Sequence, residues 1–196
     1  MAGRPKQYDR DDVLDRALTL FWDKGYEATG VADLTSTCGL GRQSLYNAFG
    51  DKRGLFLAAL GRYNCAFGGQ VIERLRDPNE DPLASIATVL STHRAEKPAT
   101  GCLVANTAAE LGPHDEEIAA ALRRQVDLIR GGFESALGRL QETDRLHPKL
   151  TPETGSHLLI AVIEGMAVLD RLGVDSDQLD SIVATVLDRL TPDEST

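Results

Sequence analysis

The stretch "TSTCGLGRQSLYNAFGDKRGLF", residues Thr35–Phe56, decides the fold class, because it interrupts a helix-patterned chain with glycines, aromatic residues and basic side chains. Short apolar periodicities on both sides of "CGLG" predict two short helices, at about residues 31–37 and 42–49. A longer amphipathic helix precedes them. It should begin near Asp9 or Asp11, since acidic residues favour a helix N-terminus, and end at the segment "KGY". Two short helices joined by a glycine-containing turn and packed on a third helix form a helix-turn-helix.

The second short helix carries side chains suited to DNA. Gly39 would make the turn, and apolar residues such as Leu34 and Leu45 would hold the helices together. The side chains left facing outward are Arg42, Gln43, Ser44, Tyr46 and Asn47. Arginine pairs well with guanine, glutamine and asparagine pair with adenine, and hydroxyl groups reach phosphates. We therefore expect this helix to lie in a DNA major groove.

The longer segment "GYEATGVADLTSTCGLGRQSLYNAFGDKRGLF", residues 25–56, resembles the DNA-binding signature of TetR-type one-component transcriptional regulators. The ordered matches are Gly25, Tyr26, Thr29, Val31, Leu34, Gly39, Leu40, Leu45, Tyr46, Phe49, Lys52 and Leu55. Three positions depart from the signature. Gly30 and Gly41 stand where a capping Ser or Thr is common, and Ala48 replaces a usual His or Tyr. So many ordered matches make the resemblance specific.

The resemblance also implies roles for individual side chains. It places Thr29, Tyr46 and Lys52 on DNA phosphates, and Arg42, Gln43, Ser44 and Asn47 near base edges. Tyr46 could instead be a core aromatic residue, and Lys52 an ordinary solvated lysine. The N-terminal segment "AGRPK" adds Arg4 and Lys6, which could lie along an A·T-rich minor groove or belong to a disordered tail.

Helical periodicity continues to the end of the chain and predicts an all-α protein of about nine helices. Asp51 should cap a long helix that reaches about residue 76, and the glycines within it make a kink plausible. The further helices are expected at about residues 82–96, 102–111, 115–143, 152–172 and 176–190. We expect a helix-turn-helix DNA-binding domain in residues 1–54 and a helical effector-binding and dimerisation domain in residues 55–196.

The last two predicted helices have apolar stripes that could pair two copies of the chain. Helix-turn-helix proteins commonly bind half-sites about 34 Å apart as dimers. The stripes consist of Leu159, Val162, Ile163, Met166, Leu169, Leu179, Ile182, Val183, Val186 and Leu190. We expect a four-helix homodimer interface, which the family resemblance also implies. The alternative is that these residues form an intramolecular core.

The intervening helices could enclose a small-molecule effector. Candidate lining residues are polar or bulky side chains at apolar or helix-facing positions: Phe67, His93, Cys102, Asn106, Glu110, Gln125, Ile129, Phe133 and Glu164. Glu164 lies in an apolar helix and must be paired, solvated or raised in pKa, and a ligand amine could be its partner. The segment "GCLVAN" also resembles a subgroup of the family. Its Cys102 could sense oxidants or electrophiles at a helix N-terminus, or simply fill a gap.

Composition limits the remaining possibilities. The net charge is -9, yet residues 1–62 hold nine basic and eight acidic residues, against twelve and twenty-two in the rest. Only the first segment is therefore suited to a polyanion. The three cysteines lack the spacing of a disulfide framework or a zinc site, and we expect no metal and no cofactor. The longest apolar run is too short for a membrane span, so we expect a cytoplasmic protein.

These features predict a ligand- or redox-responsive transcriptional repressor that acts as a homodimer on double-stranded, pseudo-palindromic operator DNA. Activation by the same machinery stays open. One alternative is a helical small-molecule-binding protein without operator binding, which the acidic balance and the departures at Gly41 and Ala48 leave open. An enzyme using Cys102 with a histidine is disfavoured, because no nucleophile turn, metal cluster or phosphate loop accompanies these residues.

Overall fold

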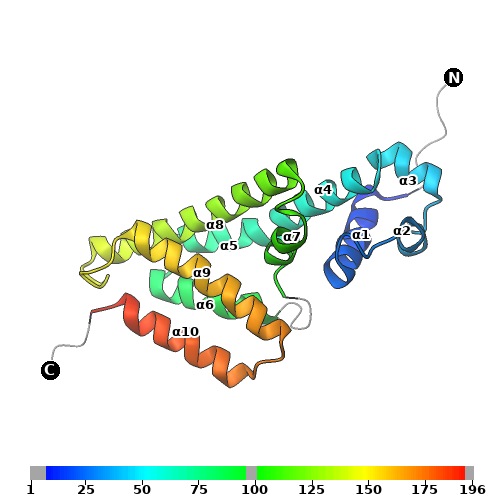
Figure 1. Ribbon diagram of the computed structural model, residues 1–196. Coiled ribbons are helices and arrows are strands. Elements are labelled where there is room, and N and C mark those ends of the chain that lie inside the picture. Colours follow the sequence, from blue (N-terminus) through cyan, green and yellow to red (C-terminus); the bar gives the residue numbers. More distant parts are fainter. Residues whose placement is uncertain (1–7, 96–100, 193–196) are drawn as a thin grey trace.

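The computed structural model describes residues 8–95 and 101–192, with side chains as far as residue 91 in the first range. Figure 1 shows an elongated, helical molecule with the N-terminal helices at one end and a bundle at the other. The described helices are α1 (Arg10–Lys24), α2 (Val31–Cys38), α3 (Arg42–Phe49), α4 (Lys52–Tyr63), the π-helical η1 (Asn64–Gly68), α5 (Gly69–Arg76), α6 (Pro82–Ala95), α7 (Leu103–Leu111), α8 (Glu116–Glu142), α9 (Pro152–Arg171) and α10 (Ser176–Leu190). The all-α prediction is confirmed.

The N-terminal helices begin and end where their sequences favour it. The Asp9 carboxylate accepts a hydrogen bond from the Asp11 N–H at 2.9 Å and so caps α1. Between α2 and α3, Gly39 has a φ of 66°, in the left-handed region that glycine adopts without strain. The turn therefore has the glycine that its backbone requires.

Helix α4 joins the two ends of the molecule. The Phe56 ring packs edge-on against Phe21 at 5.0 Å and meets Tyr26 at 5.1 Å between ring centroids. The same buried cluster continues into α7 and α8, for example through Leu103 and Ile118. Because one core crosses from α1 to α8, the domain boundary between residues 54 and 55 stays a prediction.

The long helical segment of residues 52–76 changes from α-helix to π-helix in its middle. Here α4 gives way to the five-residue π-helix η1, and α5 follows without a break. The sequence predicted a kink at Gly61, Gly68 and Gly69, and η1 lies at these glycines. π-Helical turns are rare and often occur at functional sites. Counted with η1 as one segment, α4 and α5 bring the described helices to the nine that the sequence predicted.

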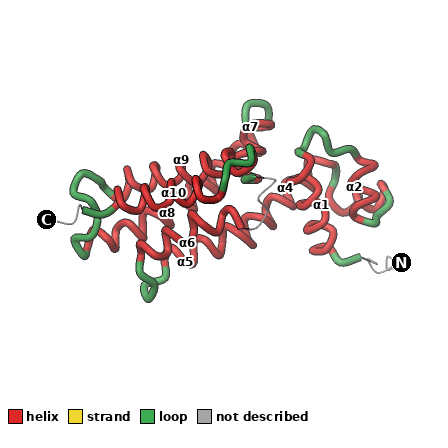
Figure 2. Tube along the Cα trace, turned by 90° about the horizontal axis from the view of Figure 1, so that it is seen from below, coloured by secondary structure: helices red, strands yellow, loops and turns green. Residues whose placement is uncertain are grey.

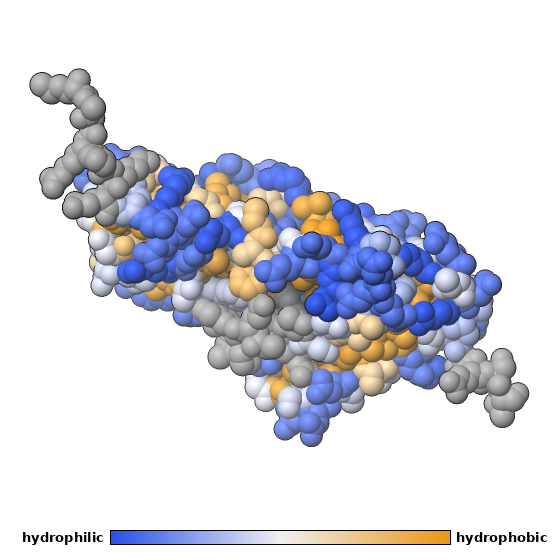
Figure 3. All heavy atoms as spheres, turned by 180° about the vertical axis from the view of Figure 1, so that it is seen from behind, coloured by the Kyte–Doolittle hydropathy of each residue, from blue (hydrophilic) through white to orange (hydrophobic). Residues whose placement is uncertain are grey.

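The C-terminal bundle surrounds α8. Helix α8 packs against α5, α6 and α9, and α10 lies against α6 and α9; α8 and α9 cross in the view of Figure 1. Figure 2 shows the same helices at the end of the molecule away from α1 and α2. A second buried cluster fills the space between them and includes Phe133, Leu137, Leu159 and Ile163. On the face drawn in Figure 3, hydrophilic residues cover most of the surface and apolar residues form separate patches. Among the described residues, most large apolar side chains are buried.

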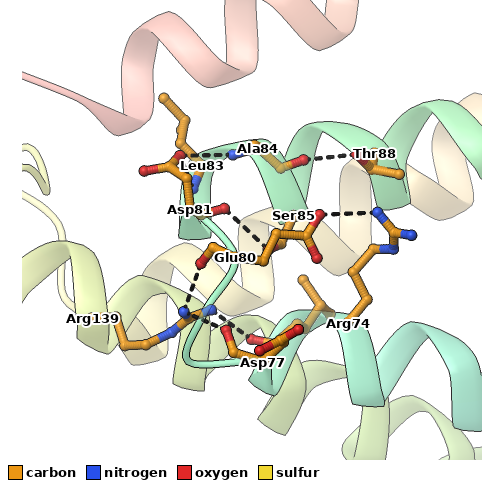
Figure 4. A network of polar contacts seen from close by, with 10 residues as sticks. Arg74, Asp77, Glu80, Asp81, Leu83, Ala84, Ser85, Thr88 and Arg139 are labelled. Carbon is orange, nitrogen blue, oxygen red and sulfur yellow. Dashed lines mark hydrogen bonds and ion pairs between the residues drawn. The ribbon is translucent and has the colours of Figure 1, made fainter.

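The turn between α5 and α6 is fastened to α8 by one arginine. The Arg139 guanidinium donates to the carbonyl oxygens of Asp77 at 2.6 Å and Glu80 at 2.9 Å, as Figure 4 shows, and also to that of Leu75 at 3.1 Å. Asp81 then caps α6 by accepting from backbone N–H groups in its first turn. This network fixes the end of the bundle that lies away from the helix-turn-helix.

Candidate DNA-binding surface and effector cavity

Helix α3 presents a polar face to solvent. Its inner side packs through Leu45, which is fully buried, whereas Arg42, Gln43, Ser44 and Asn47 are exposed. The Gln43 Nε2 atom donates to Asn47 Oδ1 at 3.1 Å, so the two amides lie one turn apart on the same face. Guanidinium, amide and hydroxyl groups thus converge on one surface, which is the chemistry that reads base edges.

Tyr46 and Lys52 are both half-buried. The Arg42 guanidinium carbon lies 5.3 Å from the centroid of the Tyr46 ring, and Lys52 Nζ lies 4.2 Å from the centroid of the Tyr26 ring. Such cation–π contacts orient the side chains without neutralising their charge. Their predicted phosphate contacts stay predictions, and Arg4 and Lys6 lie outside the described residues.

The structure contradicts the phosphate contact predicted for Thr29. This side chain is fully buried, and its hydroxyl donates to the Gly25 carbonyl oxygen at 2.6 Å. Thr29 therefore holds the turn before α2. Sequence reasoning missed Arg10, which lies 4.4 Å from the centroid of the Phe49 ring and donates to the Ala48 carbonyl oxygen at 3.1 Å. Only the packing of α1 against α3 reveals that Arg10 supports α3.

Both glycines that depart from the family signature are helix N-caps without a side-chain hydrogen bond. At α2 the Asp33 carboxylate partly compensates, because it accepts from the Gly30 N–H at 2.9 Å and from Lys24 Nζ at 2.6 Å. At α3, no carboxylate of the described residues takes this role for Gly41. The first N–H groups of α3 therefore have no side-chain acceptor from the N-cap.

Five of the predicted effector residues line one small cavity of about 40 Å³ between η1, α7, α8 and α9. They are Phe67, Cys102, Gln125, Ile129 and Glu164. The rest of the wall is mainly apolar, with Val71, Val104, Val126, Ile160 and Ile163 among its residues. Residues far apart in the sequence are thus brought together around a small, mostly apolar space.

Three polar side chains in this cavity wall, Cys102, Gln125 and Glu164, are incompletely paired. The Cys102 Sγ lies 3.8 Å from Glu164 Oε1, whereas Glu164 Oε2 and Gln125 Nε2 are buried without a hydrogen-bond partner in the described parts of the chain. Burial raises the pKa of the Glu164 carboxyl. Burial and the nearby Glu164 also raise the pKa of the Cys102 thiol to about 12. The helix N-terminus therefore does not make Cys102 a thiolate in this state.

Three of the other four predicted effector residues, Asn106, Glu110 and Phe133, do not line this cavity. Phe133 is fully buried in the second core, so the prediction that it binds effector is wrong: side chains of the bundle enclose its ring completely. Asn106 and Glu110 line a separate groove of about 370 Å³ between α7 and the N-terminal helices. The side chain of His93 lies outside the described residues.

Glu110 joins α7 to the helix-turn-helix. Its two carboxylate oxygens accept hydrogen bonds from the backbone N–H groups of Tyr26 at 2.9 Å and Glu27 at 2.8 Å. These N–H groups belong to the loop between α1 and α2, at the edge of the DNA-binding helices. Glu110 therefore acts as a clamp between the two ends of the molecule.

Two further contacts cross the same junction. The Arg53 guanidinium donates to both carboxylate oxygens of Asp115, at 2.6 and 2.8 Å. This contact holds the pKa of Asp115, the N-cap of α8, well below its usual range. The Trp22 Nε1 atom donates to the Gly101 carbonyl oxygen at 2.8 Å. Movement of α7 or α8 would therefore strain or break these contacts to α1 and α4.

The predicted dimer interface is wrong for six of its ten residues. Leu159, Ile163, Met166, Leu179, Val183 and Leu190 are at most 6% exposed and belong to the second core. These residues face the other helices of their own chain, because the most apolar stripe of a helix is drawn into the intramolecular core. Val162, Leu169, Ile182 and Val186 are half-buried and pack against the same core.

A different side of α9 is apolar and uncovered. It carries Leu158, Ala161, Gly165 and Val168, with Leu172 just beyond the end of the helix, and all five are exposed. Leu158, Val168 and Leu172 are 41, 53 and 74% exposed. We call these five residues the α9 apolar stripe. Exposed apolar stripes of this kind mark interaction surfaces.

Comparisons with known proteins agree with this architecture. The family model described as "Bacterial regulatory proteins, tetR family" matches residues 13–59, and "Tetracyclin repressor-like, C-terminal domain" matches residues 82–186. The chain is 32% identical to the HTH-type transcriptional repressor ComR of Escherichia coli K12, over 97% of this chain and 92% of that protein. It is 36% identical to the uncharacterized HTH-type transcriptional regulator YezE of Bacillus subtilis 168, over 74% of this chain and 76% of that protein.

Solved structures show the same fold. A cysteine mutant of the TetR family regulator CifR, complexed with 26-base-pair double-strand operator DNA, is 29% identical and has a TM-score of 0.84. That comparison covers 96% of this chain and 100% of the CifR chain. Reduced NemR of E. coli has a TM-score of 0.83 at 19% identity, over 95% of this chain and 99% of the other, and shows the fold alone.

The fold and the polar face of α3 define a helix-turn-helix DNA-binding regulator with a helical C-terminal domain. The chain belongs to the TetR family of transcriptional regulators. The family resemblance is therefore confirmed, and because the family is non-enzymatic, the enzyme alternative is excluded. None of the described helices is long and apolar enough to cross a membrane.

Proposed function

We propose that the protein is a transcriptional repressor that binds a pseudo-palindromic operator as a homodimer and releases it when a small-molecule effector enters the C-terminal domain. The observation that carries the proposal is the exposed polar face of α3, supported from behind by Leu45 and Arg10. CifR, the similar regulator, was crystallised with double-strand operator DNA. The proposed place of action is the cytoplasm.

In this proposal α3 is the recognition helix. Arg42, Gln43, Ser44 and Asn47 read base edges, while Tyr46 and Lys52 contact phosphates. The first N–H groups of α3 have no side-chain acceptor at the Gly41 N-cap, so they can donate to a DNA phosphate. Arg4 and Lys6 precede the described residues and would add minor-groove contacts.

The α9 apolar stripe forms the core of the homodimer in this proposal. Gly165 lies in its centre and has no side chain to hold two helices apart. Helix α10 completes a four-helix interface with its exposed side, which includes Ala184. A twofold axis would then set the distance between the two recognition helices, as paired half-sites require.

The effector acts through the junction between the two ends of the molecule. Cys102 at the start of α7 lines the cavity, and Glu110 near its end clamps the loop between α1 and α2. A ligand that favours a shifted α7 would weaken the DNA-binding arrangement by population shift. A redox signal at Cys102 is the second candidate, because this thiol lines the same cavity. Its raised pKa makes it the weaker one, since the thiolate is the reactive form.

The direct test is selection of genomic DNA fragments by the purified protein, with fresh reductant and low salt. A shared palindromic sequence among the enriched fragments would support operator binding and identify neighbouring genes. Tyr46→Phe should weaken binding to that site modestly if the hydroxyl contacts a phosphate. No enrichment under these conditions would overturn the proposal and favour the small-molecule-binding alternative.

A further inference from the structure

The cavity lined by Cys102, Gln125 and Glu164 contains polar atoms that the fold leaves without partners. Glu164 Oε2 and Gln125 Nε2 are both buried and make no hydrogen bond within the described residues, and Gln125 is only 3% exposed. Buried polar groups are nearly always paired, because an unpaired one costs about 1–3 kcal/mol. Two such atoms in the wall of one cavity indicate that something else completes their interactions.

The charge of the cavity wall indicates which kind of ligand could pair with these polar atoms. Glu164 is the only residue with a carboxyl group among the described lining residues, and none of those residues is basic. Among the described residues, the Cys102 thiol donates to Glu164 Oε1 at 3.8 Å. A carboxylate in an apolar wall is stabilised most effectively by a positive charge brought to it.

Aromatic rings lie on another side of the same cavity. Tyr63 and Phe67 line it with their ring centroids 5.0 Å apart. Aromatic faces attract cations, and more strongly where water is excluded. The cavity therefore combines a carboxylate, two rings and an apolar wall, which are the groups that recognise an organic ammonium ion.

We propose that this cavity binds a small organic ammonium ion, with Glu164 as its counter-ion and Gln125 as a hydrogen-bond donor to an oxygen that accompanies it. The inference rests on the proposed effector function and names its ligand class. About 40 Å³ holds roughly three waters, so the part of the ligand next to Glu164 is small, with about three to five non-hydrogen atoms. A larger ligand requires movement of η1, where Gly68 packs directly against Gln125.

The position of the sole tryptophan provides the readout. Trp22 on α1 packs edge-on against Tyr63 at 5.2 Å and Phe67 at 5.9 Å between ring centroids. A ligand that touches these two rings should change the Trp22 fluorescence. Because the measurement needs no DNA, its failure is distinct from failure of operator binding.

The experiment titrates the full-length protein at pH 7 with n-butylamine, 1-butanol and butyrate, three probes of similar length that differ in charge. We expect saturable binding of butylamine, with a dissociation constant on the order of millimolar for so small a ligand. Butylamine should bind at least about tenfold more tightly than butanol, and butyrate more weakly than either, because only the ammonium pairs with Glu164.

Variants of two carboxylates on α9 test the named counter-ion. Glu164→Gln should reduce butylamine affinity about tenfold and leave butanol binding unchanged, whereas Glu153→Gln, at the exposed start of α9, should change neither. Equal binding of butylamine and butanol to the unmodified protein would overturn the proposal whether or not Glu164→Gln folds. Unchanged butylamine binding by a folded Glu164→Gln variant, or no saturable binding of butylamine, would overturn it as well.

Discussion

The helix-turn-helix and the C-terminal bundle hold their polar groups in opposite environments. On α3, Arg42, Gln43 and Asn47 are exposed and hydrated, so they cost the fold little. In the bundle, Gln125 and Glu164 are surrounded by apolar residues and lack partners in the described chain, so they reduce its stability. We therefore expect that mutation can separate DNA recognition from fold stability, whereas the proposed effector recognition and fold stability depend on the same residues.

The largest expected effect tests whether the two regions are independent. Phe56→Ala should lower the free energy of unfolding by about 3–5 kcal/mol, because its ring is 2% exposed in the core that crosses from α1 to α8. Urea unfolding followed by circular dichroism and Trp22 fluorescence should show one coincident transition. Phe133→Ala, in the second core, is the matched variant. If Phe133→Ala loses the helical signal of the bundle while the Trp22 fluorescence stays that of the folded protein, the two regions are independent and the shared-core interpretation is wrong.

The next effect concerns the surface that should join two copies. Val168→Asp should raise the dimer dissociation constant by at least about 100-fold, because twofold symmetry would bury the new charge twice. Sedimentation equilibrium measures this directly. Leu128→Asp is the control, since Leu128 on α8 is 51% exposed and Val168 is 53% exposed. Equal dissociation by both variants, or by neither, would argue against the α9 apolar stripe as the interface.

A substitution of Arg42 should change operator affinity without changing the stability of the fold. Arg42→Ala is expected to weaken operator binding by about 1–3 kcal/mol, and to change the free energy of unfolding by less than about 0.5 kcal/mol, because the side chain is exposed. Fluorescence anisotropy with a selected operator fragment gives the affinity. Arg74→Ala, on α5 in the bundle, should leave operator affinity unchanged. A similar loss in both variants would indicate a general charge effect.

The smallest effect is a pH dependence from Glu164. Burial raises its pKa in the folded chain, so the folded state binds its proton more tightly than the unfolded state does. The carboxyl therefore destabilises the fold increasingly as the pH rises from the unfolded pKa through the raised folded pKa. Glu164→Gln should be more stable than the unmodified protein by about 1 kcal/mol at pH 8, and the gain should vanish near pH 4. A gain of the same size at both pH values would show that ionisation is not its cause.

Local chemistry explains how much of the fold could be predicted. Asp9 before an acidic first turn, Gly39 between two short helices and Asp51 before α4 are signals carried by neighbouring residues, and all three occupy the predicted caps or turn. The π-helix η1 could be anticipated only as a kink, because glycines weaken a helix without specifying its alternative winding. The buried hydroxyl of Thr29 was missed, since its partner is a backbone carbonyl that sequence patterns do not locate.

Apolar periodicity alone could not predict whether the apolar side of a helix packs in the core of its own chain or against a second copy. The spacing of Leu159 and Ile163 predicts a buried face equally well in a core and in a dimer, and only the position of α8 assigns it to the core. The same packing leaves Val168 outside. In the cavity, the sequence singled out Glu164 by its apolar surroundings, but the meeting of Cys102, Gln125 and Glu164 depends on three helices.

The sequence by itself determined the family, the helices and the amide and guanidinium groups of α3, because these depend on residues within a few turns of one another. The tertiary structure decided which face of α9 is free, that Glu110 clamps the DNA-binding helices, and that one cavity holds two unpartnered polar groups. These features arise where helices distant in the chain meet. Such contacts depend on the mutual packing of whole helices, which no local pattern encodes.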